Sequence, residues 1–171
     1  MPLWLYENQL FKYIFFYMKL IPFQLFFVLL LILNSCNSTD SKPVKKNIFF
    51  ENGKIRRESF EVNGKAEGKM TDFFMDGKIR SERYFVNGMQ TGRTVIYYQS
   101  GKIKEVQYYD NRGLREKGDS IWYENGNLQF TAQFKDNKRN GEMIKYDSTG
   151  IIIYAAMMQN DTLIRVLNQG N

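Results

Sequence analysis

The side chains that could perform chemistry in this 171-residue chain are few. There is no histidine, so the commonest general base and metal ligand is absent. Two acidic residues, Glu58 and Glu82, lie 24 residues apart, a spacing that other residues of the chain share, but Val106 takes the next such position. Recurrence of this kind favours a position on a strand face over a catalytic carboxylate pair. We therefore expect a protein that is not an enzyme, with no cofactor and no metal site.

The only cysteine, Cys36, stands at the end of an apolar segment, so no intramolecular disulfide can form. Residues 20–33 are apolar, follow Lys19 and lead into Leu33-Asn34-Ser35-Cys36, which has the order of an export signal. These last four residues resemble a bacterial lipobox, in which a peptidase cuts before the cysteine and its thiol receives diacylglycerol. The resemblance implies a signal peptide over residues 1–35, lipidation of Cys36 and a location in the bacterial cell envelope, on a membrane.

Two features of this leader leave alternatives open. Residues 10–33 are long enough to cross a bilayer as an uncleaved helix, although Lys12 and Lys19 lie within them. Residues 1–17 are aromatic and poor in basic residues, so a translation start at Met18 would give a more ordinary signal peptide.

The segment 36–47 is predicted to hold the lipidated cysteine and a flexible tether. Residues 37–46 are polar, contain Pro43 and show no periodicity. Without residues 1–35 the chain keeps 22 basic and 17 acidic residues, a net charge of +5. This mildly basic charge is not typical of a nucleic-acid-binding protein. We expect contact with a membrane through the lipid anchor and none with nucleic acid.

A glycine returns at a nearly constant spacing through the rest of the chain. The spacings are 24, 24, 25 and 24 residues, and the members are Gly53, Gly77, Gly101, Gly126 and Gly150. An aromatic doublet precedes each of the first four, and an aliphatic residue follows each glycine two positions later. Such self-similarity indicates stacked supersecondary units that cannot bury their apolar faces alone. We expect these glycines to be structural turn residues.

Turn residues divide each unit into two short strands rich in β-branched and aromatic residues. Asn52-Gly53, Asp76-Gly77 and Asn125-Gly126 predict two-residue hairpin turns, which need positive φ. A second turn follows about eleven residues later, as at Asn63-Gly64, and extra residues at 112–117 predict a protruding loop in the third unit. The prediction is an all-β fold: an elongated antiparallel β-meander of about five 24-residue hairpin repeats, with roughly ten strands, over residues 48–171.

The repeated unit reads aromatic-aromatic-x-x-Gly-Lys-Ile, then Asn-Gly, then Gly. It resembles the variant MORN repeat found in bacterial YwqK-type antitoxin-like proteins. The resemblance covers residues 48 to about 158 and is closest in FFENGKIRRESFEVNGKAEG and FFMDGKIRSERYFVNGMQTG. It implies hairpin repeats that act as an interaction scaffold.

Two sets of side chains are candidates for binding. Adjacent residues of a strand face opposite sides, so one aromatic of each doublet should face the core and the other the solvent. The predicted exposed stripe, with lysines at its rim, consists of Phe74, Tyr98, Tyr123, Lys78 and Lys102. The reverse assignment, with Phe73, Tyr97 and Trp122 exposed, stays open. A basic ladder formed by Lys54, Lys78, Lys102, Arg56, Arg80 and Lys104 is the other candidate, unless it is a solvated face balanced by glutamates.

These observations favour a membrane-anchored, non-enzymatic scaffold that binds a protein partner, which the sequence does not identify. An antitoxin or immunity-like lipoprotein that neutralises one dedicated toxin is the second hypothesis. A hydrolase of envelope polymers is the third, and it would require two facing carboxylates in a deep cleft.

Overall fold

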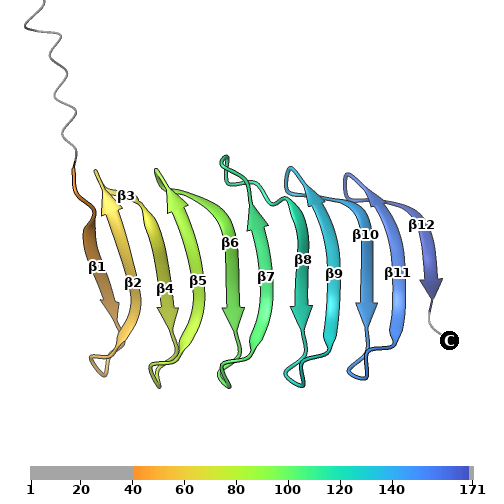
Figure 1. Ribbon diagram of the computed structural model, residues 1–171, viewed down its shortest axis with the longest axis horizontal. Helices are drawn as coiled ribbons and strands as arrows, with labels where there is room; N and C mark the ends of the chain where they lie inside the picture. The colour runs from red at the N-terminus through yellow and green to blue at the C-terminus, as the bar shows by residue number, and fades with distance from the viewer. Residues whose placement is uncertain (1–40, 170–171) are drawn as a thin grey trace, which may run out of the picture. The chain divides into compact units, whose positions relative to one another are not determined.

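The computed structural model describes residues 41–169, which form one antiparallel sheet with consecutive strands side by side (Figure 1). The predicted all-β meander is thus confirmed for this part of the chain. The strands are β1 (Val44–Phe49), β2 (Ile55–Val62), β3 (Lys65–Ala66), β4 (Gly68–Phe73), β5 (Ile79–Val86), β6 (Met89–Tyr97), β7 (Ile103–Tyr109), β8 (Lys117–Trp122), β9 (Leu128–Lys135), β10 (Lys138–Tyr146), β11 (Ile152–Gln159) and β12 (Thr162–Gln169). The predicted leader, with Met18 and Cys36, lies outside the described residues. Within residues 41–169 no helix has the length and apolar character needed to span a membrane.

The sheet begins before residue 48, where the predicted repeats start. Strand β1 begins at Val44, inside the segment 36–47 that was predicted as a tether, and Val44 to Phe49 pair with β2. That part of the tether prediction is wrong, because β2 offers these residues a free edge with which to pair. At the other end, β12 pairs with β11 and closes the last hairpin. The short strand β3 also pairs with β2 and directly precedes β4 in the chain.

The five periodic glycines lie in turns along one edge of the sheet, and all have positive φ, between 79° and 99°. In the turn at Gly77, the Phe74 amide donates to the Lys78 carbonyl (2.8 Å) and the Gly77 amide donates to the Phe74 carbonyl (2.9 Å). This is a three-residue hairpin loop in which only the glycine is left-handed. The predicted two-residue turns are therefore wrong at this edge. The residue before the glycine acts as a cap instead, as when the Asp76 carboxylate accepts from the Lys78 amide (3.1 Å).

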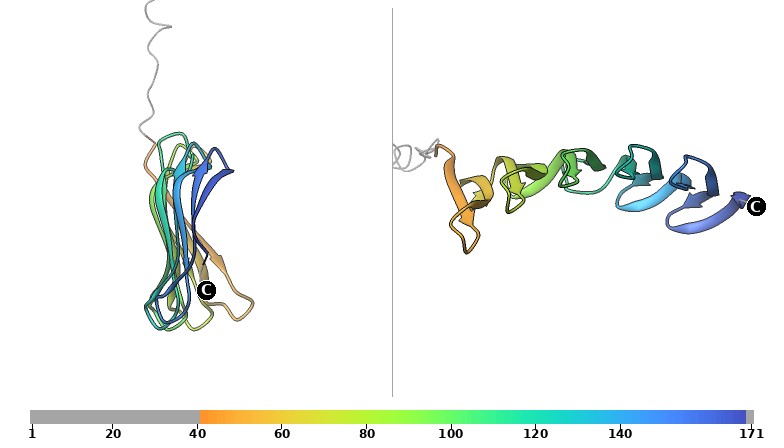
Figure 2. Two further views of the ribbon diagram at one scale, coloured as in Figure 1. Left: turned by 90° about the vertical axis from the view of Figure 1, so that its right-hand side faces the viewer. Right: turned by 90° about the horizontal axis from the view of Figure 1, so that it is seen from below.

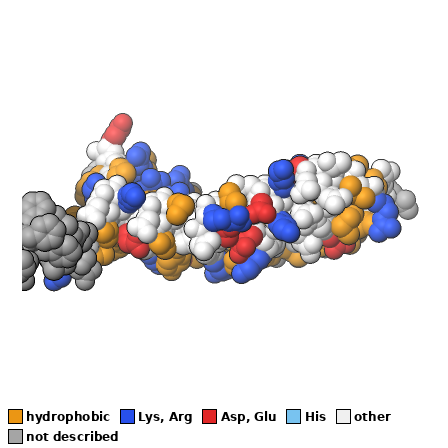
Figure 3. Space-filling model, turned by 90° about the horizontal axis from the view of Figure 1, so that it is seen from above, with side chains coloured by type: hydrophobic (Ala, Val, Ile, Leu, Met, Phe, Trp, Pro, Cys, Tyr) orange, Lys and Arg blue, Asp and Glu red, His pale blue; other side chains and the backbone are white. Residues whose placement is uncertain are grey.

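Two-residue turns occur at the opposite edge, where both central residues have positive φ. They are Asn63-Gly64, Asn87-Gly88, Asp136-Asn137 and Asn160-Asp161. The third unit differs, because Gly113 closes a three-residue loop through its amide to the Asp110 carbonyl (3.1 Å). That loop is bound to the next turn, since the Asn137 amide donates to the Arg115 carbonyl (3.0 Å) and Arg112 pairs with Asp136. These contacts hold the predicted loop of the third unit against the turn of the next unit. Figure 3 shows this edge, with acidic and basic side chains intermixed.

The sheet is a single layer, as the two side views show (Figure 2). The two strands on either side of each glycine turn pair with a register shift close to the turn. One example lies between Asp72 and Phe73, where β4 pairs with the start of β5. The bends that such bulges introduce let side chains of one face gather without a second layer. An apolar cluster lies in β9 to β11 and is formed by Ala132, Met143, Ala156 and Met158, with Phe130, Phe134 and Tyr154 packed against it.

We predict that Gly77→Val lowers the free energy of unfolding by about 1–2 kcal/mol, because a β-branched residue is strained at positive φ. The φ of Gly77 is 93°, and no atom lies within 4 Å of the position of an added Cβ, so conformation rather than collision sets the cost. Urea unfolding of the two proteins measures it. Met75→Val, in the same turn but 59% exposed, is the control and should change little. Equal stability of Gly77→Val and the parent would contradict the prediction.

Candidate functional site: an arginine-lined hollow

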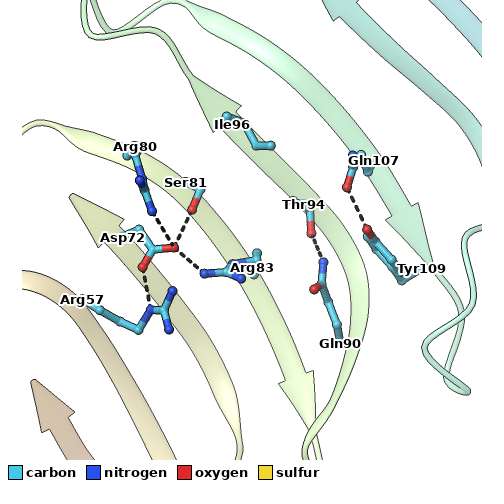
Figure 4. A pocket seen from close by; sticks show the side chains of 10 residues that line it. All are labelled: Arg57, Asp72, Arg80, Ser81, Arg83, Gln90, Thr94, Ile96, Gln107 and Tyr109. Atoms are coloured by element: carbon cyan, nitrogen blue, oxygen red, sulfur yellow. Dashed lines mark hydrogen bonds and ion pairs between the residues drawn. The ribbon is translucent and has the colours of Figure 1, made fainter. Parts of the chain in front are cut away.

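The strongest electrostatic feature of the described residues is a buried carboxylate surrounded by arginines. Asp72, in β4, is 2% exposed. Its Oδ1 accepts from Arg57 Nε of β2 at 2.6 Å, and its Oδ2 accepts from Ser81 Oγ of β5 at 2.9 Å (Figure 4). Arg83 Nη2 also pairs with Oδ2, and Arg80 Nη2 lies 3.9 Å from it. Three cationic groups thus surround one anion.

The sheet register brings these residues together. Arg57 pairs with Asp72 and Asp72 with Ser81, and directly paired residues present their side chains on one face. Arg83 follows Ser81 by two positions and so shares that face. Arg80 lies in the register shift at the start of β5, and in Figure 4 its guanidinium points toward Asp72.

The environment of Asp72 fixes its charge. Burial alone raises the pKa of this carboxyl, but hydrogen bonds from Arg57 and Ser81 and the charge of Arg83 outweigh it, so the pKa lies below its usual value. Asp72 is therefore ionised at neutral pH, and its oxygens are occupied by donors. It can hold arginines in place, but it is poorly suited to exchange protons with a substrate.

The arginines form one end of a hollow of about 440 Å³ on this face. Its lining is Arg57, Asp72, Arg80, Ser81, Arg83, Gln90, Thr94, Ile96, Gln107 and Tyr109. At the other end the Gln90 amide donates to Thr94 Oγ1 (2.7 Å) and the Tyr109 hydroxyl donates to Gln107 Oε1 (2.8 Å). The hollow is therefore cationic at one end and neutral but polar at the other. Among residues 41–169, no three acidic, histidine or cysteine side chains gather closely enough to hold a metal ion.

The aromatic doublets do not divide into one core row and one open row. Phe73, Phe74, Tyr97, Tyr98, Trp122 and Tyr123 are all half-buried. The Tyr98 hydroxyl donates to the Trp122 carbonyl (2.7 Å), and the Tyr123 hydroxyl donates to the Tyr146 carbonyl (2.9 Å). The prediction that Phe74, Tyr98 and Tyr123 form a solvent-facing stripe is therefore wrong. The two tyrosines instead connect each repeat to the next.

The basic ladder is not a uniform row either. Lys78 Nζ donates to the Gln99 carbonyl (3.0 Å) and Lys102 Nζ donates to the Glu124 carbonyl (2.8 Å), so both lysines connect adjacent turns. Lys104 Nζ lies 5.6 Å from the centre of the Tyr98 ring. Of the six ladder residues, Arg80 alone lines the hollow.

The two recurring glutamates are paired with lysines. Glu58 lies 2.7 Å from Lys45 Nζ, and Glu82 pairs with Lys69 and accepts from the Tyr97 hydroxyl at 3.1 Å. The hydrogen bond from Lys69 is the main reason why the pKa of Glu82 is lowered. Both carboxylates therefore have the structural role on a strand face that their recurrence favoured.

The sequence reasoning missed Asp72 and its partners Arg57, Ser81 and Arg83. One signal was present: the residue before the aromatic doublet is isoleucine in three other repeats (Ile48, Ile96 and Ile121) but aspartate at position 72. An acidic residue at an otherwise apolar position requires cationic partners nearby.

The fold and the hollow define a single-layer β-repeat protein with an arginine-lined hollow on one face. Residues 90–111 and 120–136 match the family described as the MORN repeat variant, so MORN-variant repeats are present in these two segments. No curated protein matches the chain.

Two solved structures show weak similarity to this chain. One is a chain in the crystal structure of accessory secretory protein 1,2 and 3 in Streptococcus pneumoniae, with 15% identity, a TM-score of 0.34, and 65% of this chain and 20% of that chain covered. Another is a chain in the crystal structure of the GtfA/B complex bound to UDP and GlcNAc, with 8% identity, a TM-score of 0.36, and 79% and 29% coverage. The protein thus spans less than a third of the length of either chain.

Proposed function

We propose that this protein is a non-enzymatic scaffold of the bacterial cell envelope, anchored by a lipid at Cys36, whose repeat sheet binds a protein partner. The observation that supports this most is the single-layer sheet, since no second layer covers either face of β1 to β12. Consecutive hairpins of such a sheet present one extended surface, as repeat proteins use for binding. Matches to the MORN repeat variant support the same function.

The pairing of Glu58, Glu82 and Asp72 with basic side chains favours a scaffold over a hydrolase. Hydrolysis of an envelope polymer needs one carboxyl free to donate a proton and another free to attack or to activate water. Glu58 and Glu82 are paired with lysines, and Asp72 is held by arginines.

The lipid anchor is proposed from the sequence around Cys36. We predict that Cys36→Ala in the producing bacterium leaves an unprocessed precursor and abolishes labelling by a fatty-acid probe, because no other thiol is present to accept a lipid. The parent chain, expressed in parallel, should be labelled and shorter. Normal labelling of the variant would overturn this part of the proposal.

Affinity capture tests the scaffold function. The full chain, purified in detergent and immobilised, should retain a defined protein from envelope extracts, and the retained protein should bind again after purification. Release of soluble fragments from purified envelope polymer, without any retained protein, would overturn the scaffold proposal in favour of the hydrolase.

The resemblance to YwqK-type antitoxin-like proteins favours a more specific version of the same function. In that version the partner is a single toxin, which the anchored protein neutralises. A captured protein that stops growth when produced without this chain, but not with it, would support this version. A captured protein without toxicity would leave the general scaffold as the function.

A further inference from the structure

We propose that the arginine-lined hollow binds an extended, acidic peptide segment, with a carboxylate of that segment held by Arg80 and Arg83. This inference rests on the proposed scaffold function and names the chemistry of its partner.

The charge balance at one end of the hollow is positive. Arg57, Arg80 and Arg83 face a single lining carboxylate, Asp72, which leaves two positive charges uncompensated within the lining. The nearest further acid in contact with the lining is Glu105, which accepts from the Gln107 amide at the other end. An anion that enters the hollow therefore meets a surplus of cationic groups at the Arg80 end.

Two of the arginines retain capacity for a ligand. The Arg80 side chain is 51% exposed and is 3.9 Å from Asp72, too far for a hydrogen bond, so its donors are accessible. Arg83 uses Nη2 for Asp72, and its side chain is 24% exposed, so part of its guanidinium is accessible from the hollow. Because the ion pair with Asp72 holds the Arg83 guanidinium in place, less side-chain entropy is lost when it binds a carboxylate.

The length of the hollow favours a peptide over a small anion. Its lining comes from five neighbouring strands, β2, β4, β5, β6 and β7. Four strand spacings of about 4.8 Å give a length of roughly 19 Å, which an extended chain spans with about six residues. A single phosphate or carboxylate would occupy only the arginine end.

The far end offers neutral groups that match a peptide backbone. The Gln90 amide donates to Thr94, which leaves the Gln90 carbonyl oxygen as an acceptor and the Thr94 hydroxyl as a donor. The Tyr109 hydroxyl donates to Gln107 and can still accept. Amide and hydroxyl groups of this kind pair with backbone N–H and C=O groups without requiring charge. A peptide with a carboxylate at the arginine end and backbone N–H and C=O groups at the far end fits both ends of the hollow.

Fluorescence anisotropy with labelled peptides tests the inference on the full chain in detergent. Hexaglutamate should bind, and hexaglutamine should bind at least ten-fold more weakly. Arg80→Gln should weaken hexaglutamate binding about ten-fold, which corresponds to about 1.4 kcal/mol. Arg56→Gln is the matched control, because Arg56 holds the same position one repeat earlier but does not line the hollow. It should change the affinity less than two-fold.

A second variant shows whether weaker binding could result from a folding defect. Arg83→Lys keeps the charge beside Asp72 but replaces the fork of donors, and it should also weaken hexaglutamate binding while the circular dichroism stays that of the parent. Equal binding of hexaglutamate by the parent and Arg80→Gln would overturn the inference. Displacement of hexaglutamate by inorganic phosphate at equal molar concentration would overturn it too, in favour of a small-anion site.

The scaffold function and the peptide-binding hollow can fail independently of each other. If the immobilised parent and Arg80→Gln capture the same envelope protein equally well, the hollow is not the binding site, although the scaffold function stands. If hexaglutamate binds as expected but no envelope protein is captured, the scaffold function fails and the peptide-binding hollow stands.

Discussion

Asp72→Asn should lower the free energy of unfolding by about 3 kcal/mol, the largest effect that we expect from a single substitution. Removing one member of a buried charge cluster leaves the others uncompensated, which costs roughly 3–5 kcal/mol when all are buried. We take the lower end because Arg57 and Arg83 are 33% and 24% exposed and water screens part of their repulsion. Urea unfolding of the parent and the variant at neutral pH measures the difference.

The control for this substitution is Asp76→Asn. Asp76 also has a lowered pKa, mainly through the hydrogen bond from the Lys78 amide, but it lies in an exposed turn. Its replacement should change the stability little. Similar losses from the two substitutions would contradict the special role that we give to the buried cluster.

The same cluster predicts a pH dependence. Because the pKa of Asp72 is lower in the folded state than its ordinary value of 3.8, the stabilisation is fully present above about pH 4. It is lost as the pH falls through the folded-state pKa, where the carboxyl takes up a proton. The parent should therefore lose its stability advantage over Asp72→Asn in acid, and a constant difference between them from pH 7 to pH 2 would contradict this account.

Tyr98→Ala should lower the free energy of unfolding by about 2–3 kcal/mol. A fully buried aromatic costs roughly 3–5 kcal/mol on truncation, and this half-buried ring should cost less than half as much, about 1–2 kcal/mol. The lost hydrogen bond from its hydroxyl to the Trp122 carbonyl adds about 1 kcal/mol. The effect belongs to stability because Tyr98 connects two repeats, which reverses the expectation that this residue acts mainly in partner capture.

Two variants separate the contributions at Tyr98. Tyr98→Phe keeps the ring and should lose only about 1 kcal/mol. Tyr84→Ala is the control, because Tyr84 is 45% exposed and should lose less than about 1 kcal/mol. If Tyr98→Ala unfolds like the parent but captures less partner, the ring belongs to a binding surface after all.

The fold was largely predictable because every repeat carries the same local information. The glycine period, the strand composition and the turn residues all indicate hairpins in sequence order, and the sheet has this order. The type of turn at Gly77 was not predictable from Asp76-Gly77 alone. Asp76 can adopt positive φ, or its side chain can cap the turn. In the structure it caps the turn, because its carboxylate accepts a hydrogen bond from the Lys78 amide.

The site was less predictable, because its partners come from three strands. Arg57, Asp72 and Arg83 meet only through the pairing of β2 with β4 and of β4 with β5. Alternation along a strand does not give the register between strands, and the bulges shift that register within each repeat. The aromatic doublets did not predict the exposed residues for a related reason: the acceptors for the Tyr98 and Tyr123 hydroxyls lie in the following repeat.

The tyrosine hydroxyl bonds also determine how such a chain can change its length. Tyr98 reaches a carbonyl 24 residues ahead and Tyr123 reaches one 23 residues ahead, so both junctions use the same rule. If residues 99–123 were excised, Tyr98 would precede Glu124 and would stand where Tyr123 now meets the Tyr146 carbonyl. A whole unit can therefore be removed or added while the same type of tyrosine-to-carbonyl bond forms at the junction, and the surface shrinks or grows in steps of about 10 Å.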